Sequence, residues 1–149
     1  MKSMTNSIAG LAAALWLGGA SAQQDDFTAR QEALLAQAQA ALAADPDDAA
    51  AAIWTGRRLG YLGRYEEAIA TYTEGWRRHP ADARFPRHIG HRLISMRRYD
   101  EAEEMFVQAV ALVAAEPDAV EPDGLPNAAG VPTSTLKGNI YYHLGLAHY

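Results

Sequence analysis

The stretch Gly63-Arg64-Tyr65-Glu66-Glu67-Ala68 returns 34 residues later as Arg97-Arg98-Tyr99-Asp100-Glu101-Ala102. The same offset places Gly56 over Gly90. Self-similarity at a fixed period of this length is typical of proteins built from stacked helical units, each too small to bury its own apolar face. This repeat therefore predicts the fold more directly than any single motif in the chain.

The first repeat is predicted to form two antiparallel helices, over residues 49–62 and 65–78. Asp47 or Asp48 can cap the first helix, because a short acidic side chain accepts hydrogen bonds from unpaired backbone N–H groups. Acidic residues open the second helix and basic residues close it, as the helix dipole favours. Pro80 then ends the unit, because proline cannot continue a helix.

The second repeat is predicted to place helices at about residues 86–96 and 99–114. Pro86 is tolerated only in the first turn of a helix, so we expect the first of these helices to start late. A third unit begins at about Gly138, and the chain stops at Tyr149 before the partner helix. Because stacked units normally need at least three members for stability, we interpret the chain as a fragment of a longer repeat protein.

Small residues occur at matching places in the two units, where two helices must approach closely, and aromatic residues fill the space beside them. This pattern resembles the tetratricopeptide repeat. The residues that carry the resemblance are Gly56, Leu59, Tyr65, Ala68, Tyr72 and Pro80 in the first unit, and Ile89, Gly90, Leu93, Tyr99, Ala102, Phe106 and Ala109 in the second.

The resemblance implies an all-α protein, a right-handed superhelical α-solenoid of tetratricopeptide-type helix–turn–helix repeats. The predicted organisation has six parts. They are a signal peptide (1–22), an N-terminal capping helix (23–48), repeat 1 (49–82), repeat 2 (83–114), a proline- and glycine-rich acidic insertion loop (115–137) and the first helix of a truncated repeat 3 (138–149).

The N-terminus has the pattern of a secretory signal peptide. Lys2 supplies a positive charge, the run from Ile8 to Gly19 is apolar, and Ala20-Ser21-Ala22 forms a small-x-small cleavage site. The apolar run is shorter than the ~20 residues that span a bilayer, so retention as an uncleaved anchor is the weaker alternative. We therefore expect an exported bacterial protein, periplasmic or secreted.

Composition excludes several classes of function. The chain has no cysteine, which rules out disulfides and cysteine-ligated metals, and its net charge of −5 argues against nucleic-acid binding. No nucleophile or phosphate-binding motif is present, so we expect no enzyme activity and no cofactor. His88-x-x-His91 has a helical metal-ligand spacing, but two histidines without a neighbouring acid are a weak zinc signal, and we expect no metal.

Arg84, Arg87, His88 and His91 are spaced to form one stripe along a helix. The resemblance places this stripe on the first helix of its unit, which lines the concave groove. The neighbouring units would add Trp54, Arg57 and Tyr61 on one side and Tyr142 and His143 on the other. Two interpretations stay open here, a groove for an acidic peptide or a C-terminal carboxylate and an ordinary solvated helix face.

The loop at residues 115–137 leaves a further pair of alternatives. It is either an acidic surface loop or a segment folded across the binding face, in which case the acidic residues at 116–123 could occupy the groove themselves. No membrane span is expected after signal cleavage.

The sequence therefore predicts a non-catalytic interaction scaffold or adaptor of the cell envelope that binds a protein or peptide in the concave groove. The alternative is an accessory repeat region of a larger exported enzyme whose catalytic part lies beyond Tyr149. Self-association through the unfinished third repeat is also possible.

Overall fold

The structure is a computed structural model that describes residues 8–121, 128–130 and 133–149. Its helices are α1 (Ile8–Ala44), α2 (Ala49–Tyr61), α3 (Tyr65–Arg78), α4 (Arg84–Ser95), α5 (Tyr99–Val113) and α6 (Leu136–His148). Within the described ranges there is no strand, only an isolated antiparallel bridge between Val120 and Thr135. The predicted all-α class is confirmed.

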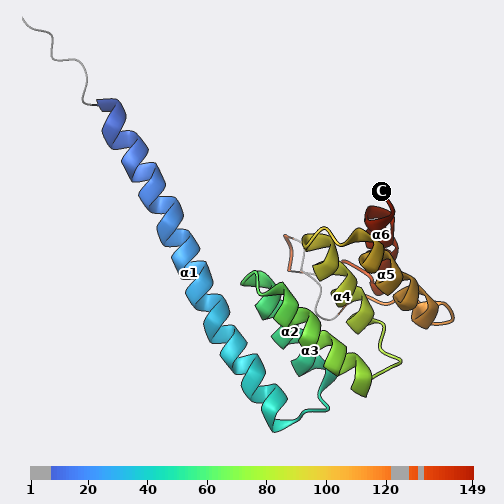
Figure 1. Cartoon of the computed structure of the whole chain (residues 1–149). Coiled ribbons are helices and arrows are strands. Elements are labelled where there is room, and N and C mark those ends of the chain that lie inside the picture. The colour runs from blue at the N-terminus through green and yellow to red at the C-terminus, as the bar shows by residue number, and fades with distance from the viewer. Residues whose placement is uncertain (1–7, 122–127, 131–132) are drawn as a thin grey trace, which may run out of the picture.

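The helices stack as an all-α solenoid (Figure 1). Each helix packs on the next one along the chain, and α2, α4 and α6 also contact one another in order. These three are the first helices of their units, so their shared contacts make them the inner layer of the stack. That arrangement is what brings residues of three successive repeats to one surface.

The turns that join paired helices recur from one repeat to the next, as the helices do. Asp48 caps α2 by accepting hydrogen bonds from the N–H groups of Ala50 and Ala51. The turn after α2 contains Gly63 with φ of 74°, and the matching residue of the next unit, Arg97, has φ of 60°. Only glycine adopts such values without steric cost, so the second turn is the more strained of the two.

Helix α4 begins earlier than the sequence predicts. It starts at Arg84, two residues before the predicted start at Pro86. Pro86 still lies in the first turn, where its missing N–H would have had no partner in the helix. The early start also places Phe85, which is fully buried, on the core side of the helix.

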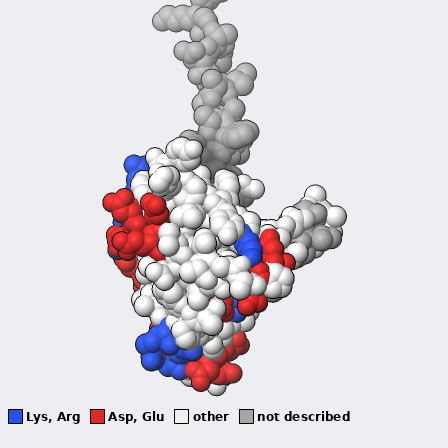
Figure 2. Space-filling model, turned by 90° about the vertical axis from the view of Figure 1, so that its right-hand side faces the viewer, with Lys and Arg blue, Asp and Glu red and all other residues white. Residues whose placement is uncertain are grey.

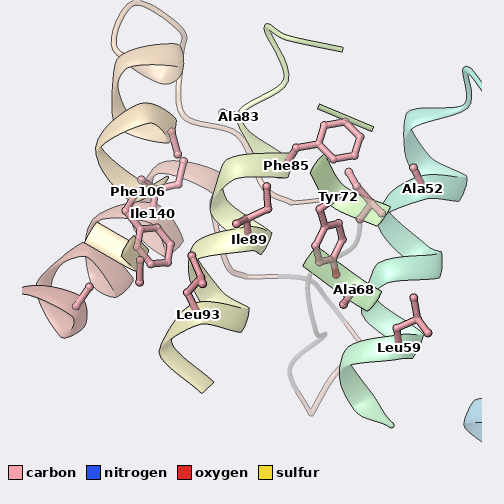
Figure 3. Close-up of a cluster of buried hydrophobic side chains, with 14 of the residues drawn as sticks. Ala52, Leu59, Ala68, Tyr72, Ala83, Phe85, Ile89, Leu93, Phe106 and Ile140 are labelled. Atoms are coloured by element: carbon pink, nitrogen blue, oxygen red, sulfur yellow. The ribbon is translucent and has the colours of Figure 1, made fainter. Parts of the chain in front are cut away.

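The core lies between the two layers of helices (Figure 3). A Cβ placed on Gly56 would lie 2.3 Å from the ring of Tyr72, and one on Gly90 would lie 2.8 Å from the ring of Phe106. Each glycine thus leaves room for an aromatic ring from the helix that follows. Phe106 in turn lies beside Ile140 of α6, which extends the same core into the third unit.

Helix α1 differs from its predicted form. The sequence predicts a capping helix within residues 23–48, after a cleaved signal peptide, whereas α1 runs without a break from Ile8. Its C-terminal half packs on α2 and its N-terminal half extends away from the other helices (Figure 1). Residues 1–7 of the predicted signal peptide lie outside the described residues. No helix in the described part of the chain combines the length and apolarity needed to cross a membrane.

Surface charges are mostly paired. On the face drawn in Figure 2, acidic and basic side chains gather at the margins and uncharged atoms cover most of the middle. The start of α3 carries an ion pair of 2.6 Å between Arg64 and Glu67, and the start of α5 repeats it between Arg98 and Glu101. Ion pairs this exposed to solvent are screened and contribute little to stability, so their interest here is that they recur in both repeats.

Candidate functional site

The inner layer of helices encloses a cavity of about 320 Å³, which we call the groove cavity. Its walls come from α2, α4 and α6, with Tyr72 of α3 and two residues of the segment between α5 and α6. The lining residues are Arg57, Tyr61, Tyr72, Arg87, His88, His91, Arg92, Glu121, Ser134, Asn139 and His143. The cavity is therefore cationic and aromatic, with one carboxylate inside it.

Most of the residues predicted for the groove lie in this wall. They are Arg57, Tyr61, Arg87, His88, His91 and His143. Arg87 and His88 are 5% and 4% exposed, so the stripe on α4 is not a solvated helix face at these two positions.

The other three predicted residues do not line the groove cavity. Arg84 lies at the start of α4 and forms an ion pair of 2.6 Å with Asp82. Tyr142 is 64% exposed and makes an edge contact with His143, at 5.1 Å between ring centroids. Trp54 lies beside the rim, where the guanidinium of Arg57 sits 4.7 Å from the centre of its ring.

The most informative contact of the groove cavity joins Arg87 to Glu121. Arg87 Nη2 lies 2.5 Å from Glu121 Oε1, and both side chains are almost fully buried. Asn139 donates a hydrogen bond of 2.8 Å from Nδ2 to the other carboxylate oxygen, Oε2. A carboxylate from an extended segment is thus held between an arginine of α4 and an amide of α6.

The histidines of α4 accept hydrogen bonds from their neighbouring arginines. Arg87 Nη2 lies 3.1 Å from His88 Nε2, and Arg92 Nη2 lies 2.7 Å from His91 Nδ1. Because a guanidinium can only donate, each of these ring nitrogens must be unprotonated. Both imidazoles are neutral in this arrangement.

Burial also favours the neutral form of His91. It lowers the pKa of His91 to about 3, and the positive charge of Arg92 and the nearby ring of His143 act in the same direction. The pKa of His143 is lowered too, again first by burial, although its hydrogen bond to the carbonyl of Asn139 opposes the change. The cationic character of the groove cavity therefore comes from its arginines.

Contacts between aromatic rings hold the walls of the groove cavity together. The ring of His88 stacks on Tyr72 with centroids 5.0 Å apart, and His143 stacks on Phe106 at 5.8 Å. His143 also meets His91 edge-on at 4.5 Å, which joins α6 to α4 across the cavity. Burial raises the pKa of Tyr72, so its hydroxyl stays protonated.

Sequence reasoning missed several lining residues. Tyr72 was assigned to the core alone, yet the ring that packs on Gly56 also forms part of the wall. Arg92 follows His88 by one helical turn, and that spacing could have added it to the stripe. Glu121 belongs to the acidic stretch at 116–123 that was considered as an occupant of the groove, but no sequence signal singled it out.

No three histidine, aspartate or glutamate side chains converge as a metal site within the described ranges. His88 and His91 turn to different partners, Tyr72 and His143, so their spacing along α4 does not place them on one ion. The cavity offers instead donors for an anionic or hydrogen-bonding ligand.

No protein-family model matches the sequence, and no curated protein matches it. Several solved structures do. The crystal structure of PcrH from Pseudomonas aeruginosa has a TM-score of 0.61 and 25% identity over 97% of this chain and 96% of that one. SycD of Yersinia enterocolitica, solved with a peptide of the translocator YopD, has a TM-score of 0.60 and 20% identity over 95% of each chain. These structures share the fold of this chain.

A third structure is PcrH in complex with the chaperone-binding region of PopB. It is 29% identical over 77% of this chain and 90% of that one, with a TM-score of 0.54. The neighbours support the tetratricopeptide-like character of the fold. They are matched over nearly their whole length, so they give no support to the prediction that this chain is a fragment of a longer protein.

The comparisons overturn the predicted location. The similar structures include type III secretion chaperones, which point away from an exported protein, so the prediction of an exported, periplasmic or secreted protein is wrong. The apolar run from Ile8 to Gly19 forms the start of α1. Alanine and leucine dominate both signal peptides and good helices, and composition alone did not separate the two.

Proposed function

We propose that this chain is a non-catalytic, cytoplasmic chaperone or adaptor that holds an extended segment of a partner protein in the groove cavity. The observation that carries the proposal is the contact between Arg87 and Glu121, a carboxylate of an extended segment held inside the groove. A site that holds such a group from its own chain has the chemistry to hold one from another chain.

The similar structures support the same class of partner. SycD was solved with a peptide of the translocator YopD, and PcrH with the chaperone-binding regions of PopB and PopD. By this similarity the partner is a protein of a secretion system, bound before it is secreted. An accessory region of an exported enzyme, the alternative expected from the sequence, has no counterpart among these structures.

Polar atoms of the cavity support recognition by hydrogen bonds. Arg92 Nε and Asn139 Oδ1 are buried and have no hydrogen-bond partner in the structure. Leaving such atoms unsatisfied costs about 1–3 kcal/mol each, and a bound peptide could satisfy them. At the rim, Tyr61 is 39% exposed and, with Trp54, offers the kind of aromatic surface that anchors bound peptides.

Photocrosslinking in the native host tests this function. The variant Tyr61→p-benzoylphenylalanine places a crosslinker at the rim of the groove cavity. The matched control Val107→p-benzoylphenylalanine places it on α5, where Val107 is 49% exposed and lines no part of that cavity. We expect the first variant to crosslink to one segment of one partner, identified by mass spectrometry, and the control to give no such adduct.

Crosslinked adducts of equal yield at the two positions would show non-specific binding and contradict a groove-specific partner. Absence of any adduct at Tyr61, in cells where the partner candidates are expressed, would remove the proposal. SycD has also been solved as an alternative dimer, and self-association of this chain stays a prediction that the same experiment can detect as crosslinked homodimer.

A further inference from the structure

Residues 118–121, called here the internal segment, bring Glu121 into the wall of the groove cavity. Its backbone pairs with the chain just before α6, through hydrogen bonds of 3.0 Å from the N–H of Glu121 to Ser134 O and 2.9 Å from the N–H of Leu136 to Ala119 O. Asp118 accepts a further bond of 3.0 Å from the N–H of Lys137. The internal segment is thus an extended stretch of backbone held at the start of α6.

In the internal segment, residues 118–120 are exposed and Glu121 is buried. Val120 is 51% exposed, whereas Glu121 is 3% exposed and enters the groove cavity. Glu121 also precedes Pro122 in the sequence, and a residue before proline is restricted to extended conformations. The following proline therefore favours an extended backbone at Glu121, which is also the conformation of a peptide bound along a groove.

Burying a carboxylate is costly unless it is paired and hydrogen-bonded. Glu121 is a loop residue with no need to enter the core for apolar burial, yet it is buried by contacts to Arg87 of α4 and Asn139 of α6. Both partners belong to the inner helices that would receive a ligand. The contact thus joins a loop to the binding surface of the repeats and not to their core.

We propose that the internal segment is a built-in competitor, in which Glu121 occupies the place that an acidic side chain of the partner takes. A partner must displace Glu121 from Arg87 before it can fill the groove cavity. The inference rests on the proposed function and adds two statements to it, that the partner presents a carboxylate in an extended segment and that the chain's own Glu121 occupies the place of that carboxylate until the partner binds.

Competition of this kind lowers apparent affinity, because the measured dissociation constant is the intrinsic one divided by the fraction of open groove. Loss of a hydrogen bond to a charged group changes an equilibrium constant by about 10- to 150-fold. Weakening the hold on the internal segment should therefore tighten binding of an external peptide by roughly 10-fold or more.

The test uses the full chain and a fluorescent peptide with the sequence of residues 115–123, Ala-Glu-Pro-Asp-Ala-Val-Glu-Pro-Asp. Fluorescence anisotropy compares the wild type with Glu121→Gln. The matched control is Glu116→Gln, the same loss of charge at an exposed position five residues earlier. We expect Glu121→Gln to bind the peptide at least about 10-fold more tightly than the wild type, as release of the competitor requires, and Glu116→Gln to bind like the wild type.

Equal binding by the wild type and Glu121→Gln would overturn the proposal, as would weaker binding by the variant or no binding by any of the proteins. Circular dichroism checks that Glu121→Gln keeps its helices. A peptide carrying Gln in place of Glu121 should bind less tightly than the acidic one, because it lacks the charge that Arg87 pairs with.

A reversible lock gives a second measurement that does not depend on removing Glu121. Val120 and Thr135 face each other in the antiparallel bridge as a pair without mutual backbone hydrogen bonds, a geometry in which Cα atoms are close enough for a disulfide. The chain has no cysteine of its own. The double variant Val120→Cys/Thr135→Cys should lose peptide binding when oxidised and regain it on reduction, and unchanged binding would contradict the competition.

The two proposals can fail separately. Crosslinks at Tyr61 to a partner, together with equal binding by Glu121→Gln and the wild type, would leave the function standing without the internal competitor. Tight binding of the acidic peptide by Glu121→Gln, without any partner crosslink, would establish the carboxylate site and remove the chaperone function.

Discussion

At His91, burial and nearby positive charge both lower the pKa of the imidazole. The imidazole lies among Arg57, Arg87 and Arg92, and its Nδ1 accepts a hydrogen bond from Arg92. These surroundings lower its pKa to about 3, below the ordinary value of 6.5. A protonated His91 would lose the bond to Arg92 and add a charge to a wall that is already cationic. His91 is therefore a neutral spacer between arginines.

The sign of the resulting pH dependence follows from proton counting. Between pH 6.5 and about 3 the unfolded chain binds a proton at His91 and the folded chain does not, so stability falls as the pH is lowered through this window. The slope approaches 1.36 kcal/mol per pH unit for one such group. We predict that His91→Gln loses less stability than the wild type between pH 7 and pH 4.5, measured by urea unfolding.

The control for this experiment is His148→Gln, because the side chain of His148 is 74% exposed and lies outside the groove cavity. This variant should keep the loss of stability that His91 contributes between pH 7 and pH 4.5. Parallel pH profiles for His91→Gln and the wild type would show that His91 titrates alike in the folded and unfolded chains, and would contradict its assignment as a neutral residue.

At the scale of helices, the close approach of α2 and α3 depends on a glycine. The ring of Tyr72 lies against Gly56 and also stacks on His88, which restricts its movement away from an added methyl group. The helix pair and the groove wall therefore share one aromatic ring. A change in the packing of α2 on α3 should be felt in the groove as well.

We predict that Gly56→Ala destabilises the chain by about 1–3 kcal/mol, because the added methyl overlaps the ring of Tyr72 and overpacked cores lose stability by this amount. Gly145→Ala is the matched control, since Gly145 lies inside α6 and a Cβ there meets nothing within 4 Å. It should gain about 0.5–1 kcal/mol from helix propensity. Urea unfolding measures both, and a loss at both positions would contradict the packing argument.

At the scale of the molecule, α1 closes the open end of the solenoid. It contacts α2 through one stripe, in which Leu35 is 2% exposed and Gln31 accepts a hydrogen bond of 3.0 Å from Arg58. Terminal elements of repeat proteins cover an apolar face that would otherwise meet water. The part of α1 before Gln31 has exposed side chains from residue 23 onward and contributes nothing comparable.

Because only part of α1 packs on α2, truncating a side chain should change stability by different amounts at two positions of this helix. Leu35→Ala should destabilise the chain by about 2–5 kcal/mol, the cost of a cavity at a buried leucine. Phe27→Ala removes a larger side chain that is 43% exposed, and we expect a change within about 0.5 kcal/mol, as at other surface positions. Equal losses at the two residues, measured by thermal unfolding, would show that the whole length of α1 is docked.

Much of the fold could be predicted because its causes are local and recur along the chain. The bounds of α3, the cap at Asp48 and the glycine beneath Tyr72 each follow from propensity, capping or residue size at a fixed spacing. The stripe on α4 placed Arg87 and His88 on one face for the same reason. The continuous α1 was missed, because an alanine-rich apolar run is compatible with a signal peptide and with a helix.

The 34-residue period sets which helix faces are buried, and it was enough to predict a solenoid of paired helices with arginine, histidine and aromatic side chains along its inner layer. The meeting of Glu121 with Arg87 and Asn139 in the groove cavity is visible only in the folded chain. That contact joins a loop to helices on either side of it in the chain, and no periodicity governs where a loop lies. Its place depends on whether the attraction of a nearby positive charge compensates for the cost of burying the carboxylate.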